Sequence, residues 1–216
     1  LEIQYADGTK DTVATDSSWL WSNDGSVRFA DNKDGEIVDA NKKPTYSSRA
    51  KETSYAVAPS ASNNVPIAEK ETFKGKMATT PSGKKIIDFK QNFAGYVSFK
   101  INAKKGQKIT LRFGEMLDDN GELTLKNIQC SNKKITTPLQ TIKYTCKDGV
   151  NEYKPNFAIF GFTYMEIDTD IEVAADDFTA IAIYSDMEET GFFESSNELL
   201  NKFVTATKWS TKSNST

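Results

Sequence analysis

Short segments that alternate apolar and polar residues, each bounded by turn residues, recur along most of this chain. In Lys108–Phe113 the residues Ile109, Leu111 and Phe113 share one side, which is the period of a half-buried strand. Similar segments are Leu1–Tyr5, Asp11–Thr15, Lys85–Phe89, Tyr96–Ile101, Gln140–Thr145, Tyr164–Asp168 and Phe178–Tyr184. We expect Gln91–Gly95 to separate two of these strands. Several short strands at this spacing predict a mainly β protein built as an antiparallel β-sandwich.

The composition changes along the chain and divides it into four parts. Residues 1–47 carry one hairpin signal at Asp7-Gly8, and a single hairpin is marginal alone, so we interpret this part as a portion of a β-module. Residues 48–68 are rich in Ala, Ser, Asn and Pro without periodicity, which indicates an extended linker. Residues 69–188 contain the strands of the sandwich, and residues 189–216 contain a different pattern.

That different pattern predicts one C-terminal helix, from near Ser196 to about Trp209. Ser195-x-x-Glu198 fits a capping box. Five residues then fall on one helical face: Leu199, Leu200, Phe203, Val204 and Thr207. A lone amphipathic helix needs a surface that buries its apolar face, so we expect it to fray when no such surface is present.

Several absences limit the function. The chain has no histidine, which excludes a Ser-His-Asp triad, a Cys-His pair and any zinc site that contains histidine. The net charge of −3 makes nucleic acid and anionic membranes poor candidates as partners. No apolar run approaches the roughly 18 residues of a membrane span. We expect free thiols at Cys130 and Cys146 in a reducing compartment, with a single disulfide as the alternative.

Clustered carboxylates are the first candidates for catalysis. Glycoside hydrolysis typically uses two of them, and the chain offers Glu115 with Asp118 and Asp119, or Glu166 with Asp168 and Asp170. The second set alternates along a strand and is expected on its solvated side, so neither set is persuasive. Asp31–Glu36 superficially fits a calcium loop, but Lys33 occupies a ligand position, so we interpret it as a turn.

Aromatic residues are the candidates for carbohydrate contact. Trp19 and Trp21 share one face of an extended stretch and could form a platform that stacks on a sugar ring, although large aromatics in this position are more often core. Tyr96 is a third candidate. We expect no catalytic residue, metal site or cofactor in this chain.

Three stretches resemble a known family. Residues 87–97, IDFKQNFAGYV, resemble the "DFGQNFAGWV" signature of bacterial α-L-rhamnosidases, glycoside hydrolase family 78. Residues 106–118, GQKITLRFGEMLD, are similar to the family's "GTKVTLRFAEVLD", and residues 184–197, YSDMEETGFFESSN, to its "HSDLERTGSFECSN". Residues 15–19 and 35–40 resemble the end of the family's N-terminal sandwich, so the resemblance runs in order along nearly the whole chain.

The resemblance implies what each part of the chain is. Residues 1–47 would be the C-terminal part of a carbohydrate-binding-like sandwich, 69–188 a concanavalin-like or jelly-roll sandwich, and 189–216 the first helix of an (α/α)6 catalytic barrel. The barrel carries the carboxylates that hydrolyse terminal α-L-rhamnosyl bonds with inversion. The chain would thus be a non-catalytic accessory portion that contacts the barrel and meets a rhamnosylated glycan through the parent enzyme. A stand-alone carbohydrate-binding module is the alternative.

The sequence departs from the family pattern at three positions. Lys90 replaces the glycine of "FGQN". Residues 157–164, FAIFGFTY, are similar to "FTYHGFRYVEV", with Phe160 in place of its His and Thr163 in place of its Arg. Polar contacts that the His and Arg would make are therefore in doubt here.

Overall fold

The computed structural model describes residues 1–54, 57–58, 60–62, 65–132 and 134–216, and these divide into two compact units. The first unit comprises Leu1–Gly25 and Lys42–Asn63, and the second comprises Ser26–Asn41 and Asn64–Thr216. Parts of the expected linker over 48–68, at residues 55–56, 59 and 63–64, lie outside the described residues.

The first unit consists of two small antiparallel pairs. Strands β1 (Glu2–Gln4) and β2 (Lys10–Thr12) form the hairpin that the Asp7-Gly8 turn predicts. Strands β3 (Leu20–Trp21) and β6 (Ser48–Arg49) form the second pair. The segment expected as a linker from residue 48 therefore begins with a short strand.

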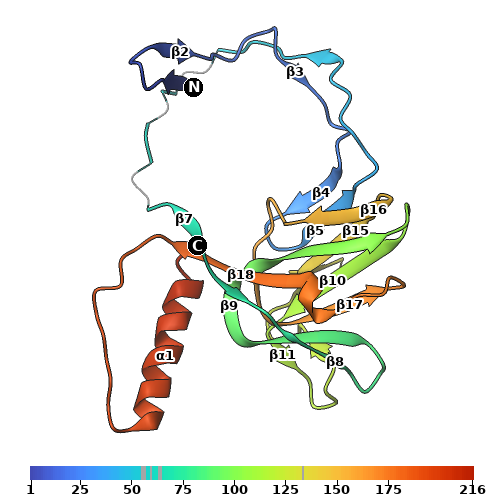
Figure 1. Ribbon diagram of the computed structural model, residues 1–216, viewed down its shortest axis with the longest axis vertical. Helices are drawn as coiled ribbons and strands as arrows, with labels where there is room; N and C mark the ends of the chain where they lie inside the picture. Colours follow the sequence, from blue (N-terminus) through green and yellow to red (C-terminus); the bar gives the residue numbers. More distant parts are fainter. Residues whose placement is uncertain (55–56, 59, 63–64, 133) are drawn as a thin grey trace. The chain divides into compact units, whose positions relative to one another are not determined.

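The second unit is a β-sandwich formed by one ten-stranded sheet that curls on itself (Figure 1). Its strands are β4 (Val27–Asp31), β5 (Gly35–Asp39), β7 (Ile67–Phe73), β8 (Lys76–Thr79), β9 (Lys85–Ala103), β10 (Lys108–Gly114), β15 (Thr141–Thr145), β16 (Gly149–Tyr153), β17 (Phe160–Thr169) and β18 (Phe178–Ser185). The mainly β prediction with a sandwich is confirmed.

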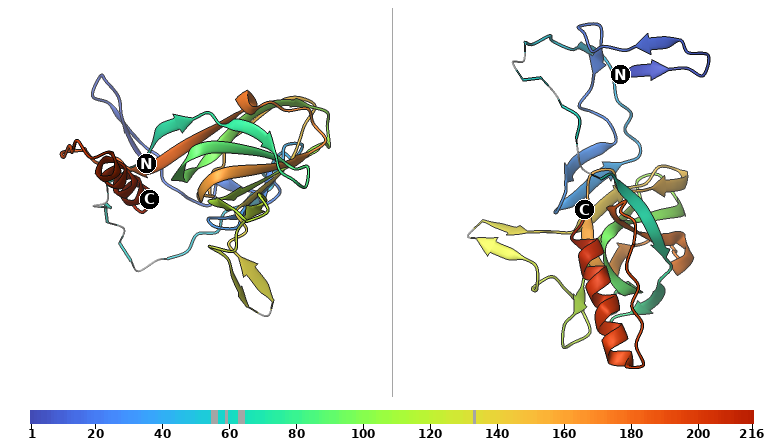
Figure 2. Two further views of the ribbon diagram at one scale, coloured as in Figure 1. Left: turned by 90° about the horizontal axis from the view of Figure 1, so that it is seen from below. Right: turned by 90° about the vertical axis from the view of Figure 1, so that its left-hand side faces the viewer.

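Smaller elements complete this unit. Two hairpins, β11 (Met116–Leu117) with β12 (Leu123–Thr124) and β13 (Cys130–Asn132) with β14 (Ile135–Thr137), lie outside the main sheet. The second of them projects from the sandwich as the yellow-green hairpin of Figure 2. A single 3-10 turn, η1 (Ala175–Asp177), precedes β18, and the helix α1 (Glu198–Ser213) follows it.

The sheet is organised around β9, whose 19 residues pair along both edges. Ile87 lies between Met165 of β17 and Met77 of β8. Further along the strand, Phe99 lies between Tyr153 of β16 and Phe178 of β18. Because one continuous strand pairs with four others in this way, the fold depends on β9 running unbroken through Gln91–Gly95. The expected break there is wrong, since turn-forming residue types continue the strand.

Gly95 marks the position where β9 passes between its neighbours. It pairs with Phe160 of β17 on one edge and with Ala182 of β18 on the other. A Cβ atom at Gly95 would lie 2.0 Å from the carbonyl oxygen of Ile181, far inside any real contact. Glycine is needed here because the β18 backbone occupies the space that any side chain at this position would fill.

Lys90 has a left-handed backbone conformation, with φ of 67°. This is the position where the family pattern has a glycine, and glycine adopts that conformation without steric cost. The Asp88 carboxylate accepts hydrogen bonds from the Lys90 amide at 2.8 Å and from its ammonium at 2.6 Å. These contacts hold a strained residue in a turn-like geometry inside the long strand.

Phenylalanine side chains form the centre of the core. Phe113 and Phe160 stack with ring centroids 4.6 Å apart, and Phe93 packs on Phe162 at 4.7 Å. Phe160 is 1% exposed, so the residue that replaces the family's His fills the core and reaches no surface. The polar contact of that His is absent here because an apolar ring occupies its place.

The hairpin of β4 and β5 belongs to the sandwich. β5 pairs in parallel with β15, from Gly35 opposite Thr141 to Asp39 opposite Thr145. Gly35 has φ of 113°, and a Cβ there would lie 1.9 Å from the Thr141 oxygen. The compact units therefore do not divide at residue 47, where we expected the first domain to end, because residues 26–41 pack with the later strands.

A buried carboxylate fixes this hairpin. Glu36 is 0% exposed, whereas its apolar neighbour Ile37 is 42% exposed. Its Oε1 accepts hydrogen bonds from the backbone amides of Asn156, Phe157 and Ala158 at 2.9, 2.7 and 3.0 Å. Its Oε2 accepts one from the Tyr153 hydroxyl. Burial and this carboxylate raise the pKa of Tyr153. Asp31–Glu36 is thus a turn that leads into a structural carboxylate.

We predict that Glu36→Ala lowers the free energy of unfolding by about 3 kcal/mol or more, because four donors lose a fully buried acceptor. Chemical denaturation followed by circular dichroism measures this loss. Glu152→Ala is the matched control, since Glu152 forms an exposed ion pair with Lys100 and its loss should change stability little. Equal losses in the two variants would contradict a structural role for Glu36.

Candidate functional site

Helix α1 contacts the sandwich through its C-terminal half. The Trp209 ring lies 5.7 Å from the Phe73 ring, which in turn stacks on Phe93 of the core at 4.8 Å. The hydroxyl of Ser213 accepts a hydrogen bond from the Ala94 amide at 3.3 Å. The Ser215 carbonyl accepts one from the Ser185 amide at 2.8 Å. The last turns of the helix are therefore anchored on β7, β9 and β18.

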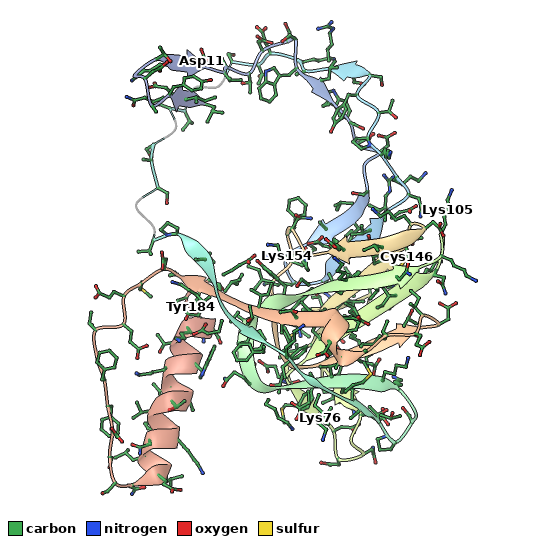
Figure 3. The ribbon with its side chains drawn as sticks, in the orientation of Figure 1. Asp11, Lys76, Lys105, Cys146, Lys154 and Tyr184 are labelled. Atoms are coloured by element: carbon green, nitrogen blue, oxygen red, sulfur yellow. The ribbon has the colours of Figure 1, made fainter. Side chains whose placement is uncertain are left out.

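A charged cluster accompanies this contact. Glu71 of β7 accepts hydrogen bonds from the Lys212 ammonium at 2.9 Å and from the Tyr184 hydroxyl at 2.8 Å. Lys212 also lies over two rings, 4.8 Å from Trp209 and 5.0 Å from Tyr184. Figure 3 shows Tyr184 beside the C-terminal end of α1. The side chain of Lys212 thus links the helix to two strands at once.

The cluster shifts the pKa of both charged groups. Desolvation by burial opposes the ionised form of Glu71, but the hydrogen bonds from Lys212 and Tyr184 outweigh it and lower its pKa. Desolvation likewise opposes the charge of Lys212, and the hydrogen bond to Glu71 outweighs it, so its pKa is raised. Both groups are therefore charged across the neutral range, and the ion pair stabilises the docked helix.

The N-terminal half of α1 leaves its apolar face uncovered. Leu199 is 76% exposed and Phe203 is 66% exposed, and Phe192 in the segment before the helix is 87% exposed. Between this segment and α1 lies an apolar cleft of about 330 Å³, which Met187 and Val204 help to line. Leu199 and Phe203 lie four residues apart and so on one side of the helix, and apolar side chains exposed together are a candidate interaction surface.

The helix begins later and differently from the expectation. Its N-cap is Asn197, whose side chain accepts hydrogen bonds from the amides of Leu199 and Leu200. Ser195 instead accepts a hydrogen bond from the Asn197 amide through its hydroxyl. The expected Ser195-x-x-Glu198 capping box is therefore wrong, because Asn197 supplies the oxygen that the first turn needs.

Trp19 and Trp21 lie in the first unit, at and beside β3. They are 46% and 50% exposed, so the core interpretation does not hold for them. The Trp19 indole nitrogen donates a hydrogen bond to the Ala14 carbonyl at 3.1 Å. Each residue thus presents a half-exposed ring from a short stretch of chain, and their role as carbohydrate contacts stays a prediction.

Tyr96 belongs to the second unit, on β9. Its hydroxyl donates to Glu69 at 2.6 Å, and Lys154 donates to the same carboxylate oxygen at 2.5 Å. Burial and the hydrogen bond to Glu69 raise the pKa of Tyr96. The hydroxyl therefore has a protein partner, and Tyr96 belongs to a different compact unit from Trp19 and Trp21.

The candidate carboxylates have structural partners. Glu115 accepts a hydrogen bond from the Asn127 side chain at 2.8 Å. Asp118 accepts hydrogen bonds from the backbone amides of Asn120 and Glu122 in a turn. Glu166 is 8% exposed and pairs with Lys84 at 3.2 Å, so its expected solvated position is wrong. Asp168 on the same strand is exposed, as expected.

Other chemistry is limited in the described part of the chain. Cys130 is exposed and Cys146 is buried, and both are free thiols. Among residues 1–54, 57–58, 60–62, 65–132 and 134–216, no group of three His, Cys, Asp or Glu side chains could hold a metal ion. No described helix is long and apolar enough to cross a membrane.

Sequence reasoning missed the residues that hold α1 in place. The apolar periodicity predicts a helix that ends at about Trp209, whereas α1 continues to Ser213, and Trp209 and Lys212 both contact the sandwich. The residues Trp209, Lys212 and Ser213 are spaced by three and four, which is a signal for a second helical face. This signal is weaker than that of the five-residue apolar face, because the apolar face has more large side chains.

We predict that docking of α1 weakens below about pH 4.5, the ordinary carboxyl value from which the Glu71 pKa is lowered. A depressed carboxyl pKa contributes stability above the unfolded value, and this contribution is lost as the pH falls through the folded value. In a Trp19→Phe, Trp21→Phe background, Trp209 is the remaining tryptophan and its fluorescence reports docking. Adding Glu71→Gln should remove the acid transition, and an unchanged midpoint would refute the assignment.

Comparison with known proteins gives the family. A family model for the bacterial alpha-L-rhamnosidase concanavalin-like domain matches residues 78–184, and one for the alpha-L-rhamnosidase N-terminal domain matches residues 1–79. An alpha-L-rhamnosidase of Alteromonas sp. is 30% identical over 99% of this chain and 24% of its own length. One of Formosa agariphila is 29% identical over 97% of this chain and 23% of its own length.

A solved structure agrees with these matches. The crystal structure of an α-L-rhamnosidase from Aspergillus terreus covers 99% of this chain with a TM-score of 0.79 at 27% identity, and 26% of that protein is matched. The chain thus spans about a quarter of the length of these relatives. The two family models together extend over residues 1–184. This chain belongs to the bacterial α-L-rhamnosidase family, with the family's N-terminal and concanavalin-like domains.

Proposed function

We propose that this chain is a non-catalytic accessory portion of an enzyme that hydrolyses terminal α-L-rhamnosyl bonds. In this proposal the sandwich and α1 present a surface on which a catalytic helical barrel packs. The whole enzyme then binds the rhamnosylated glycan, and this portion fixes the position of the barrel. The assignments 1–47, 48–68, 69–188 and 189–216 are part of the same proposal as sequence modules of the parent enzyme, with residues 26–41 of the first module packed into the sandwich.

One observation carries this proposal, the half-docked state of α1. Trp209 and Lys212 join the helix to the sandwich, while Leu199 and Phe203 project from it. A helix that is docked through one face and carries exposed apolar side chains on another fits a layer between two bodies. The length of the relatives supports a second body, since this chain covers 23% of the Formosa agariphila protein.

The described carboxylates support a role without catalysis. Glycosidases need one acid and one base or nucleophile facing a bond, typically about 5–10 Å apart and open to substrate. Glu115, Asp118 and Glu166 instead accept hydrogen bonds from their own neighbours. Oxygens of these three carboxylates are engaged in turns and ion pairs, which supports a structural role for them.

We predict that the purified chain does not hydrolyse an aryl α-L-rhamnoside at a rate proportional to its concentration. Release of the aryl group is the measurement. A proportional rate that survives repurification would overturn the non-catalytic proposal.

The surface of α1 is tested separately: Phe203→Ser should lower the free energy of unfolding by less than about 0.5 kcal/mol, and Trp209→Ala by about 2 kcal/mol.

A second candidate function is sugar binding by the first unit. The half-exposed rings of Trp19 and Trp21 favour it, since aromatic rings stack on the apolar face of a pyranose. On our proposal, L-rhamnose produces no saturable change in tryptophan fluorescence. A saturable change that is lost in Trp21→Ala and retained in Trp209→Phe would favour the binding module instead.

A further inference from the structure

A second cleft lies on the sandwich, away from α1. It has a volume of about 410 Å³, which is within the range of ligand pockets. One wall is formed by β10 and β15, and the other by β12 and the turn that follows it. Its lining residues are Arg112, Leu123, Thr124, Leu125, Lys126, Gln129, Leu139, Thr141 and Lys143.

Three cations line this cleft, and no carboxylate does. Lys126 and Lys143 form no ion pair with any described residue. This concentration of positive charge is unlike the whole chain, whose net charge is −3. A concave site lined by one sign of charge raises the local concentration of the opposite ion.

Arg112 is held in place but is not saturated. Its Nη2 lies 3.5 Å from both the Glu166 carboxylate and the Leu123 carbonyl, which are long contacts. Lys84 approaches the same Glu166 oxygen more closely, at 3.2 Å, and neutralises much of its charge. The Nε of Arg112 is buried without a partner among the described residues. The guanidinium therefore keeps N–H donors that are not committed to close protein contacts, and such donors suit a carboxylate.

Three leucines line the cleft, and we call them its leucine floor. Leu123 and Leu125 are 6% and 7% exposed, and Leu139 is 45% exposed. The hydroxyls of Thr124 and Thr141 and the amide of Gln129 also line the cleft. The Thr141 hydroxyl donates to the Leu139 carbonyl and can still accept, and the Thr124 hydroxyl accepts from the Lys126 amide and can still donate. The Gln129 amide nitrogen donates one hydrogen bond to the Pro138 carbonyl and keeps a second N–H. Such a site fits a ligand with an apolar face, several hydroxyls and one negative charge.

We propose that this cleft binds a carboxylate-bearing pyranose, a uronic acid residue of an acidic glycan. The carboxylate lies against Arg112, Lys126 and Lys143, and the C–H face of the ring covers the leucine floor. The saccharide part rests on the proposed function, because a glycosidase meets polysaccharide. The anionic part rests on the cations alone.

The test is a titration of the chain with D-glucuronate, followed by nuclear magnetic resonance. We expect saturable shifts confined to the Arg112 Nε–H and to the amides of Lys126, Gln129 and Leu139, with a dissociation constant in the millimolar range. D-glucose at equal concentration should leave these signals unmoved. Lys143→Gln should weaken binding about tenfold, since one charge-assisted contact is lost.

Lys105→Gln is the matched control, because it removes the same charge at an exposed turn outside the cleft. An equal loss of affinity in both variants would show general charge attraction and overturn the site. Acetate that binds as tightly as glucuronate would overturn the sugar ligand. Binding is measured without hydrolysis, so the outcome is separate from the activity assay that tests the proposed function.

Discussion

The Glu36 carboxylate is the contact on which the edge of the sandwich depends. It joins β5 to the loop between β16 and β17, where the pairing along one edge of β9 is interrupted. The carboxylate accepts from three backbone amides of that loop, of which the Ala158 amide is buried and would otherwise lack an acceptor, at a cost of about 1–3 kcal/mol. The carboxylate therefore serves the loop and the hairpin together. Through it, residues early in the chain complete a sheet whose other strands come much later.

This arrangement explains why the second unit is discontinuous in sequence. β5 runs parallel to β15, and parallel neighbours require a long connection, which the residues between them supply. Close approach at Gly35 and Gly95 then allows the backbones to pack without side chains between them. The two glycines and one carboxylate thus act at different points of the same sheet.

The helix gives the sandwich a second kind of surface. Its last turns are held by Trp209 and by the ion pair of Lys212 with Glu71, and its first turns are open. An isolated helix of 16 residues is only marginally stable in water. Anchoring its C-terminal end on the sandwich stabilises the helix and fixes its direction. The open face is consequently presented in one orientation, as a docking surface needs.

The sequence by itself determined the strand pattern, the late helix and the family, because periodicity and local motifs are properties of neighbouring residues. It could not determine that Glu36 is buried and Ile37 exposed, since alternation alone favours the reverse. The sequence also predicts a break in β9 at Gln91–Gly95, which is wrong because strand pairing there overrides the turn propensity of these residues. The position of Lys212 beside Glu71, and the grouping of Arg112, Lys126 and Lys143, join residues far apart in the chain. Only the tertiary structure decided these, because burial and charge proximity depend on which strands become neighbours.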